Sequence, residues 1–130
     1  MSQPEDKAPP ALHPLETRVM RRLWDLGEGT VRVVVDDLNR SVDRPRAYTT
    51  VMTTMARLER KGLLRRRREG NADVYIPTIE REAYESGRAN VEVEALVAQY
   101  GDAALAHFAR QVDRLDPERL DELRRLAADD

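Results

Sequence analysis

The fold of this chain depends on two adjoining stretches, RAYTTVMTTMARLERK at residues 46–61 and GLLRRRREGNADVYIP at residues 62–77. In the first stretch, Val51, Met55 and Leu58 recur at intervals of four and three residues, which places them on one face of a helix. The opposite face carries hydroxyl and basic side chains, namely Thr49, Thr53, Arg57 and Arg60. A glycine, Gly62, follows where such a helix ends.

The second stretch predicts a β-hairpin that is rich in arginine. Residues 63–68 and 73–76 have strand character, and Gly70-Asn71 between them suits a tight turn. Because side chains alternate along a strand, Arg65–Arg68 cannot all point the same way, and at least two flank the sheet edge or reach toward an anion. A helix of threonines and arginines followed directly by such a hairpin is typical of a winged helix-turn-helix that reads DNA.

An amphipathic pattern at residues 15–26 predicts the first helix. Its apolar stripe contains Leu15, Val19, Met20, Leu23, Trp24 and Leu26. Pro14 suits the first turn of this helix and Gly27 its end. Trp24, the only tryptophan, is interpreted as a core anchor rather than as a ring that stacks on a ligand.

A second, shorter helix is predicted at residues 33–39, after a β-prone segment at residues 30–32. Val34 and Leu38 would face inward from this helix. Pro45 disfavours helical backbone at the residue before it and so separates the second helix from the third. Two helices joined by a turn, the second with more polar contact groups, make a helix-turn-helix.

From residue 80 the chain becomes acidic, and its pattern is helical. Helices are predicted at residues 80–99 and 103–114, with Asp102 as a cap, and a last helix begins with Asp116 as N-cap and Pro117 as its first residue. Their narrow apolar faces are explained more economically by an arm that packs against its symmetry mate than by helices folded back on the first half. The candidate dimerisation residues are Val91, Leu96, Leu105, Phe108, Val112, Leu120 and Leu123.

The net charge of −2 conceals a strong asymmetry along the chain. Residues 15–78 contain 14 Arg and Lys against 9 Asp and Glu, whereas residues 79–130 contain 7 against 13. A basic first half is the electrostatic footprint of a phosphate-binding module, and chance clustering in a highly charged chain is the alternative.

The residue types exclude several classes of protein. The absence of cysteine excludes disulfides, thiol catalysis and cysteine-based metal sites, and nothing brings the two histidines together, so we expect no metal and no other cofactor. The chain has no nucleophile motif and no Gly-rich phosphate loop, which argues against an enzyme. It also has no apolar run that could cross a bilayer and no signal peptide, so we expect a cytoplasmic protein without membrane insertion.

Three regions are expected along the chain. Residues 1–12, which are polar and proline-rich, would form a disordered leader. Residues 13–79 would form the winged helix-turn-helix domain, and residues 80–130 a helical dimerisation domain. The predicted fold class is therefore mainly α, an α+β winged helix with a small hairpin followed by a helical region.

The start of the third helix is the expected contact with double-stranded DNA. The major groove admits one helix, and base edges are read by short hydroxyl groups and by the two-pronged donor of arginine. The candidate contact residues there are Arg46, Tyr48, Thr49, Thr50, Thr53 and Arg57. Arg65, Arg66, Arg67 and Arg68 of the hairpin would hold phosphate or enter the minor groove, adding affinity more than sequence discrimination. A solvated helix face is the alternative.

Three segments together resemble the penicillinase-repressor family (BlaI/MecI/CopY type). TTVMTTMARLERKGLLRRRREGNADVYIP shares its Thr-Val start, its Arg-Leu and Lys-Gly helix end, its basic wing with a Gly-Asn tip, and its Tyr return. LETRVMRRLWDLG is similar to the first helix of the family, and HFARQVDRLDPERLDELRRL to its C-terminal dimerisation helices. The resemblance covers residues 15–126.

This resemblance implies a homodimeric repressor with two winged helices on a palindromic operator, controlling β-lactamase or related resistance genes. It also implies induction through a membrane-bound sensor protease, with cleavage before a phenylalanine in the dimerisation region. The matching residue is Phe108, which here follows His107 instead of the usual Asn. Copper-sensing relatives use C-terminal cysteines, which this chain lacks.

Two other functions remain open on the sequence alone. One is a winged-helix repressor that a small ligand releases directly. The other is a protein-interaction module whose arginines meet an acidic partner. Sequence-selective retardation of DNA separates both repressors from the interaction module.

Overall fold

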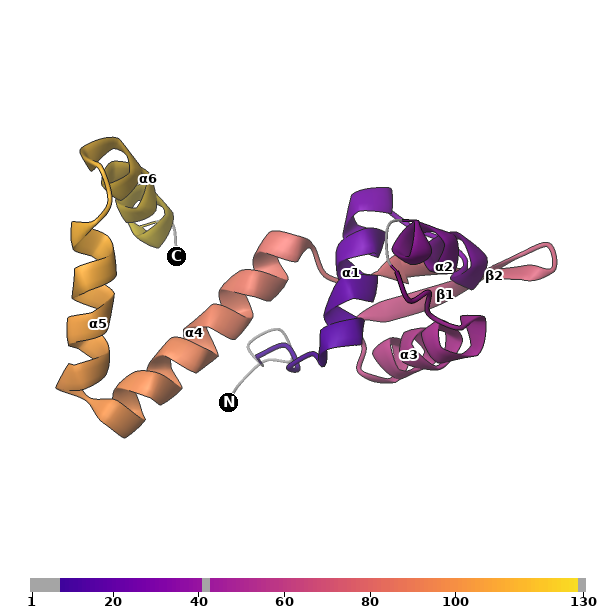
Figure 1. Cartoon of the computed structure of the whole chain (residues 1–130), viewed down its shortest axis with the longest axis horizontal. Helices are drawn as coiled ribbons and strands as arrows, with labels where there is room; N and C mark the ends of the chain where they lie inside the picture. The colour runs from indigo at the N-terminus through magenta and orange to yellow at the C-terminus, as the bar shows by residue number, and fades with distance from the viewer. Residues whose placement is uncertain (1–7, 41–42, 129–130) are drawn as a thin grey trace. The chain divides into compact units, whose positions relative to one another are not determined.

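The computed structural model describes residues 8–40 and 43–128. Its elements in chain order are α1 (Pro14–Leu26), α2 (Val31–Asn39), α3 (Tyr48–Arg60), β1 (Leu64–Glu69), β2 (Ala72–Pro77), α4 (Arg81–Tyr100), α5 (Asp102–Asp113) and α6 (Pro117–Ala128) (Figure 1). The described residues thus form helices and one antiparallel hairpin, which confirms the predicted fold class. The chain divides into two compact units, one ending at Arg88 and the other starting at Ala89.

The core of the first unit lies between α1, α2, α3 and the hairpin. Its most deeply buried apolar side chains are Val19, Met20, Leu23, Val34, Val51, Met55 and Leu58. The apolar faces predicted for α1 and α3 supply most of them. Leu26, expected in the same stripe, is 42% exposed, because α1 ends at this residue and the chain turns away at Gly27, whose φ is 88°.

The second helix begins earlier than predicted. Thr30, expected in a β-prone segment, is the N-cap of α2, and its side-chain oxygen accepts a hydrogen bond from the Val33 N–H at 3.2 Å. The prediction of a β-prone segment is wrong because burial of Val31 and Val35 against the core outweighs the preference of β-branched residues for strands. An isolated bridge does form one residue before the cap, where Gly29 pairs with Tyr75 of β2.

The hairpin has the predicted two-residue tip. β1 and β2 pair antiparallel, with Arg66 opposite Tyr75 and Glu69 opposite Ala72. Gly70 has a φ of 62°, a left-handed conformation that glycine adopts without a steric cost. β1 is shifted by one residue from the predicted range, and β2 is one residue longer at each end. The part of β1 beyond Leu64 is exposed throughout. We call the hairpin the wing.

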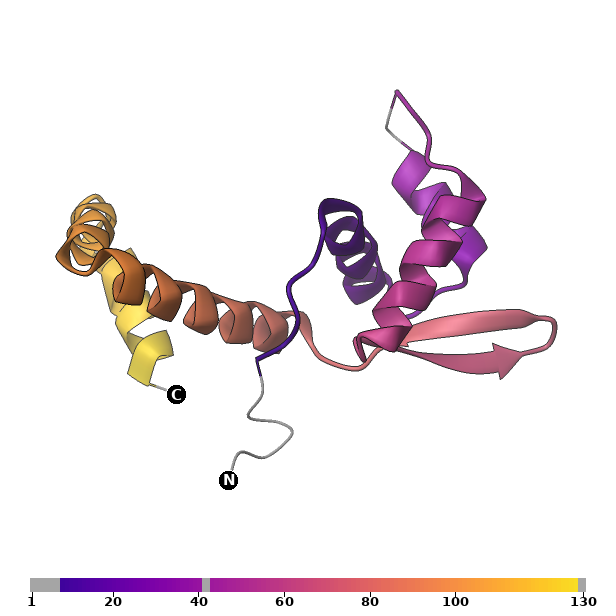
Figure 2. The ribbon, with the colours of Figure 1, turned by 90° about the horizontal axis from the view of Figure 1, so that it is seen from below.

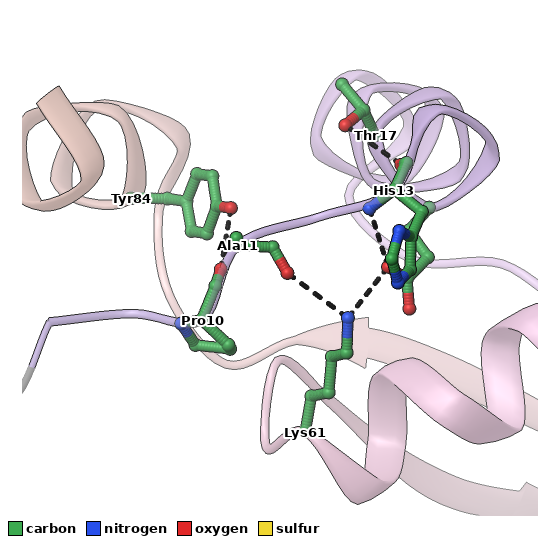
Figure 3. Close-up of polar contacts among 7 residues, drawn as sticks. Pro10, Ala11, His13, Thr17, Lys61 and Tyr84 are labelled. Atoms are coloured by element: carbon green, nitrogen blue, oxygen red, sulfur yellow. Dashed lines mark hydrogen bonds and ion pairs between the residues drawn. The ribbon is translucent and has the colours of Figure 1, made fainter. Parts of the chain in front are cut away.

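Part of the expected disordered leader is packed against the first unit. The carbonyl oxygens of Pro10 and Ala11 accept hydrogen bonds from Tyr84 (2.8 Å) and Lys61 (3.1 Å), respectively (Figure 3). The Pro9 carbonyl accepts a hydrogen bond from Arg88 at 3.1 Å. The expectation of a leader extending to residue 12 is therefore wrong for residues 9–12, which we call the N-terminal strap, and residues 1–7 lie outside the described residues.

The start of α4 also belongs to the first unit. The indole Nε1 of Trp24 donates to the Ile79 carbonyl at 2.9 Å, and its ring lies 5.6 Å from the ring of Tyr84. Trp24 is half-buried against the core, so it acts less as the expected core anchor than as a link between α1 and α4. These contacts explain why the first unit runs to Arg88 and not to the boundary expected at residue 79.

A buried ion pair joins α1 to the end of α3. Glu16 is 1% exposed, and its Oε1 accepts hydrogen bonds from the His13 N–H and from the Lys61 ammonium, both at 2.7 Å. Burial alone would raise the pKa of this carboxyl, but the hydrogen bond from His13 and the pairing with Lys61 outweigh burial and lower the pKa below its ordinary value of 4.5.

The helices of the second unit expose their apolar residues. None of the described side chains from residue 89 onward is buried. Gly101, with a φ of 56°, precedes α5 as its N-cap, so Asp102 is the first helical residue and not the predicted cap. Asp116 does cap α6 as predicted, because its Oδ1 accepts from the Arg119 N–H at 2.8 Å.

The lowered pKa of Glu16 predicts a specific loss of stability in acid. A carboxyl whose pKa is lower in the folded state stabilises the fold fully above its unfolded pKa and loses that effect as pH falls through the folded pKa. We expect Glu16→Gln to lower the free energy of unfolding by about 1–3 kcal/mol at pH 7. That deficit should shrink as pH falls below 4.5 in chemical denaturation experiments.

Glu122→Gln is the matched control, because Glu122 is exposed and pairs only with the exposed Arg119 among the described residues. This control should follow the wild-type pH curve. Parallel curves for Glu16→Gln and the wild type at all pH values would show that the Glu16 carboxylate does not stabilise the fold.

Candidate nucleic-acid interface

One side chain ties the end of α2 to the segment just before α3. The Asn39 amide donates to the Arg46 carbonyl at 3.0 Å and accepts from the Arg46 N–H at 2.8 Å. Pro45 keeps the preceding backbone out of the helical region. The Arg46 side chain is left exposed beside the start of the helix, as the sequence prediction requires.

The exposed face of α3 is the predicted one. Val51, Thr54, Met55 and Leu58 are buried. Tyr48, Thr49, Thr50, Thr53, Arg57 and Arg60 are exposed or half-exposed. The N-cap Ala47 offers no side-chain oxygen, so the first N–H groups of α3 remain available for a phosphate.

Thr54 differs from the threonines before it in the sequence. Its side chain is buried, and its hydroxyl donates to the Thr50 carbonyl at 2.9 Å. It therefore supports the helix from within. The sequence pattern separates it from its neighbours, because it lies one turn from Val51 and Leu58 on the core side.

Two residues extend this face beyond the sequence prediction for the third helix. The Arg32 guanidinium of α2 lies 4.6 Å from the centre of the Tyr48 ring, a cation–π contact that positions both groups. Met52 is 42% exposed on α3 and was not predicted as a contact residue. Its exposed apolar side chain on a polar face is the signal that could have identified it.

The wing arginines are held mostly by acidic residues. Arg66 pairs with Glu59 of α3 at 3.0 Å, and Arg67 pairs with Glu28 at 2.8 Å and with Glu69 at 2.8 Å. Arg68 pairs with Asp73 at 3.2 Å. Arg65 makes no ion pair with any residue that the structure describes. Because side chains alternate along the strand, these arginines point to different sides of the wing. Three of the four pair with acidic residues of the same chain that the sequence alone did not indicate.

These pairs change the electrostatics of the wing. The hydrogen bond from Arg67 lowers the pKa of the Glu28 carboxyl and raises the pKa of Arg67 itself. The hydrogen bond to Glu59 likewise raises the pKa of Arg66. The arginines lie at the surface, and exposed ion pairs contribute little to stability, so a phosphate can replace the carboxylates.

Four of the predicted helix residues share one hollow of the surface. Thr49, Thr50, Thr53 and Arg57 line a cavity of about 400 Å³ together with His13 and Leu15 at the start of α1. In Figure 2, α3 lies between α1 and the wing. Arg66 of the wing contacts α3 through Glu59, and none of the wing arginines lines this hollow.

No group of three or more potential metal ligands occurs within residues 8–40 and 43–128. No helix in these ranges has the length and apolar character needed to cross a membrane.

The candidate site is a hydroxyl-bearing helix, α3, between basic flanks. Such an arrangement suits contact with a polyanion whose groove accepts a helix.

Comparison with known proteins identifies the family. The chain matches the family model described as penicillinase repressor over residues 12–129. This chain belongs to the penicillinase repressor family. Membership confirms the resemblance found in the sequence and places the chain among transcriptional repressors and not among enzymes.

Two curated relatives and two solved structures add detail. The transcriptional regulators named BlaI from two Mycobacterium tuberculosis strains (CDC 1551 / Oshkosh and ATCC 25618 / H37Rv) are each 40% identical over 121 residues, which cover 88% of this chain and 81% of theirs. The solution structure of the DNA-binding domain of the repressor BlaI matches 60% of this chain and 92% of its own, with 28% identity and a TM-score of 0.51. The YusO protein of Bacillus subtilis shares the fold, with 16% identity, a TM-score of 0.50, and coverage of 91% of this chain and 73% of its own.

Thr53 lies at the centre of the exposed face and should affect sequence discrimination. We expect Thr53→Ala to reduce the ratio of operator affinity to random-DNA affinity by about 10-fold. This change corresponds to roughly 1.4 kcal/mol, which lies within the range for the loss of one base contact. Titrations of fluorescently labelled duplexes at one salt concentration measure this ratio.

Thr53→Val is the matched control, because valine keeps the methyl group and replaces the hydroxyl with a second methyl group of similar size. If valine restores the ratio, the contact is made by the methyl group, and if it does not, by the hydroxyl. An unchanged ratio in both variants would remove Thr53 from the interface.

Proposed function

We propose that this protein is a homodimeric transcriptional repressor that binds palindromic operators and controls β-lactamase or related resistance genes. The observation that carries the proposal is the exposed threonine and arginine face of α3 between basic flanks, in a chain of the penicillinase repressor family. The solved BlaI domain that it resembles is described as DNA-binding. The contact residues remain those expected from the sequence. Base contacts would come from the start of α3, namely Arg46, Tyr48, Thr49, Thr50, Thr53 and Arg57, while Arg65, Arg66, Arg67 and Arg68 of the wing would hold phosphate or enter the minor groove.

The second unit supports the homodimer. Its helices lack any described buried side chain, yet Leu96, Leu105 and Val112 are all at least 40% exposed. Apolar surface of this kind on helices is stabilised by packing against another chain. The candidate interface is the set expected from the sequence: Val91, Leu96, Leu105, Phe108, Val112, Leu120 and Leu123.

A dimer would also join two recognition helices on one DNA molecule. Linking two weak binding modules makes the second contact intramolecular and raises the overall affinity without any new contact. The two-fold symmetry of such a dimer fits an operator with two inverted half-sites.

Release of the repressor belongs to the same proposal. We place proteolytic cleavage, started by a membrane-bound sensor, at the bond between His107 and Phe108. Both residues lie inside α5, where Phe108 is half-buried and His107 is exposed. A protease that binds extended chains requires this helix to open, and a helix without buried residues opens at a small cost.

Cleavage has a direct test in cells exposed to a β-lactam. The mass spectrum of the recovered repressor should contain a fragment that ends at His107. Full induction with only the intact chain present would overturn cleavage and favour direct release by a ligand.

Truncation tests the dimer and the operator together. A chain that ends at Glu94 keeps the whole first unit and removes α5 and α6. We expect it to sediment as a monomer and to bind the DNA upstream of its own gene about 100-fold more weakly than the full chain does, because the two half-sites are no longer linked.

The control is binding to a duplex with a single half-site, for which both chains should have similar affinity. Sedimentation of the truncated chain as a dimer would place the interface elsewhere. If the full chain does not discriminate this DNA from a random duplex, the proposed repressor function is wrong.

A further inference from the structure

A basic groove lies beside α3, and apart from Arg46 its residues have no role in the contacts described above. It has a volume of about 740 Å³ and lies between α1, the end of α2 and the segment before α3. Five arginines and one aspartate line it, together with three apolar residues: Arg18, Arg21, Arg22, Arg44, Arg46, Asp37, Leu15, Leu38 and Pro45. We call it the arginine groove.

Most of its positive charge is uncompensated. Arg22 pairs with Asp37 and, at 3.2 Å, with Asp25. The other four arginines of the groove make no ion pair with any residue in the described ranges. The wing differs in this respect, since most of its arginines have acidic partners. Several guanidinium groups without acidic partners around one groove create a positive potential that attracts anions.

The arginine groove continues from the exposed face of α3. Leu15 lines both this groove and the hollow that contains Thr49, Thr53 and Arg57. Arg46 lies two residues before the start of α3 and belongs to the groove. Leu15 and Arg46 therefore connect the arginine groove to the exposed face of α3.

The groove and the wing lie on opposite flanks of α3. Arg57 and Glu59 are two positions apart, which turns them by about 200° around the helix. Glu59 faces the wing through its pair with Arg66, whereas Arg57 faces the start of α1. Figure 2 shows the same order, with α1 on one side of α3 and the wing on the other.

We infer that the arginine groove binds phosphates of the DNA backbone on the flank of α3 away from the wing. A helix in the major groove has a phosphate strand on each side, and the wing can reach only one of them. The guanidinium fork matches phosphate oxygens, so arginines without acidic partners suit the second strand. This inference rests on the proposed function, since it requires the recognition face to bind DNA.

Such contacts would fix the position of α3 in the DNA groove without reading bases. Arg18, Arg21 and Arg44 should therefore contribute equally to operator and random DNA. Their contribution should appear as salt dependence, because each phosphate contact releases condensed cations.

The test is a salt titration of the full chain and of the triple variant Arg18→Gln, Arg21→Gln, Arg44→Gln. The probes are the DNA upstream of its gene and a random duplex of the same length. We expect the slope of log affinity against log salt to fall in magnitude by about 2–3 per bound subunit on both probes, at about 0.9 for each lost contact. The ratio of the two affinities should stay unchanged.

The matched control is Arg110→Gln, Arg114→Gln, Arg124→Gln, which removes the same charge from exposed positions in and after α5. This control should keep the wild-type slope and the wild-type sedimentation. Single substitutions at the groove, each worth about one third of the effect, serve if the triple variant has a lower melting temperature.

Three results would overturn the inference. A groove variant with the wild-type slope would show that the groove does not contact DNA. If sodium tripolyphosphate at constant ionic strength raises the melting temperature of the wild type but not of the groove variant, and the DNA slopes are equal, the groove serves a free polyphosphate. A wild-type chain that binds neither duplex refutes the proposed function itself, and the inference with it.

Discussion

The ion pair between Glu16 and Lys61 links the first turn of α1 to the end of α3. It joins the first turn of α1 to the residue that caps α3, and the same ammonium also holds the strap through Ala11. Removal of either partner would leave the other charge without its counterion, so loss of either side chain should destabilise the fold. The apolar core packs α1 against α3, and the pair adds a directional contact between these two helices.

Much of the first unit follows from periodicity and turn chemistry in the sequence. The spacing of Val51, Met55 and Leu58 predicts which face of α3 is exposed, and Gly70-Asn71 predicts the turn of the wing. The errors occur where a local preference opposes a tertiary contact. The β-branched residues after Thr30 favour a strand locally, but their burial makes them the first turn of α2.

Contacts between segments far apart in the chain could not be predicted from the sequence. Nothing in PPALH indicates that its carbonyl groups meet Lys61 and Tyr84, since backbone acceptors are the same in every residue. The partners of Arg66 and Arg67 were hidden for a similar reason, because Glu59 and Glu28 are ordinary surface acids until the fold brings them to the wing. The candidate site was therefore predictable as a set of residues but not as an electrostatic surface.

The strap, residues 9–12, packs against a segment that lies far along the sequence. Pro10 and Tyr84 are 74 positions apart, yet their hydrogen bond is 2.8 Å long. Gly87 permits this approach, since a Cβ at that position would lie 2.7 Å from the Pro9 ring. An affinity tag joined close to Pro9 would place additional atoms where the strap packs against Gly87 of α4. A shortened chain that starts at α1 would instead lack the Pro10 and Ala11 carbonyl groups, which accept hydrogen bonds from the Tyr84 hydroxyl and the Lys61 ammonium. The position at which an expressed chain begins therefore affects the contacts of α4 and of the end of α3.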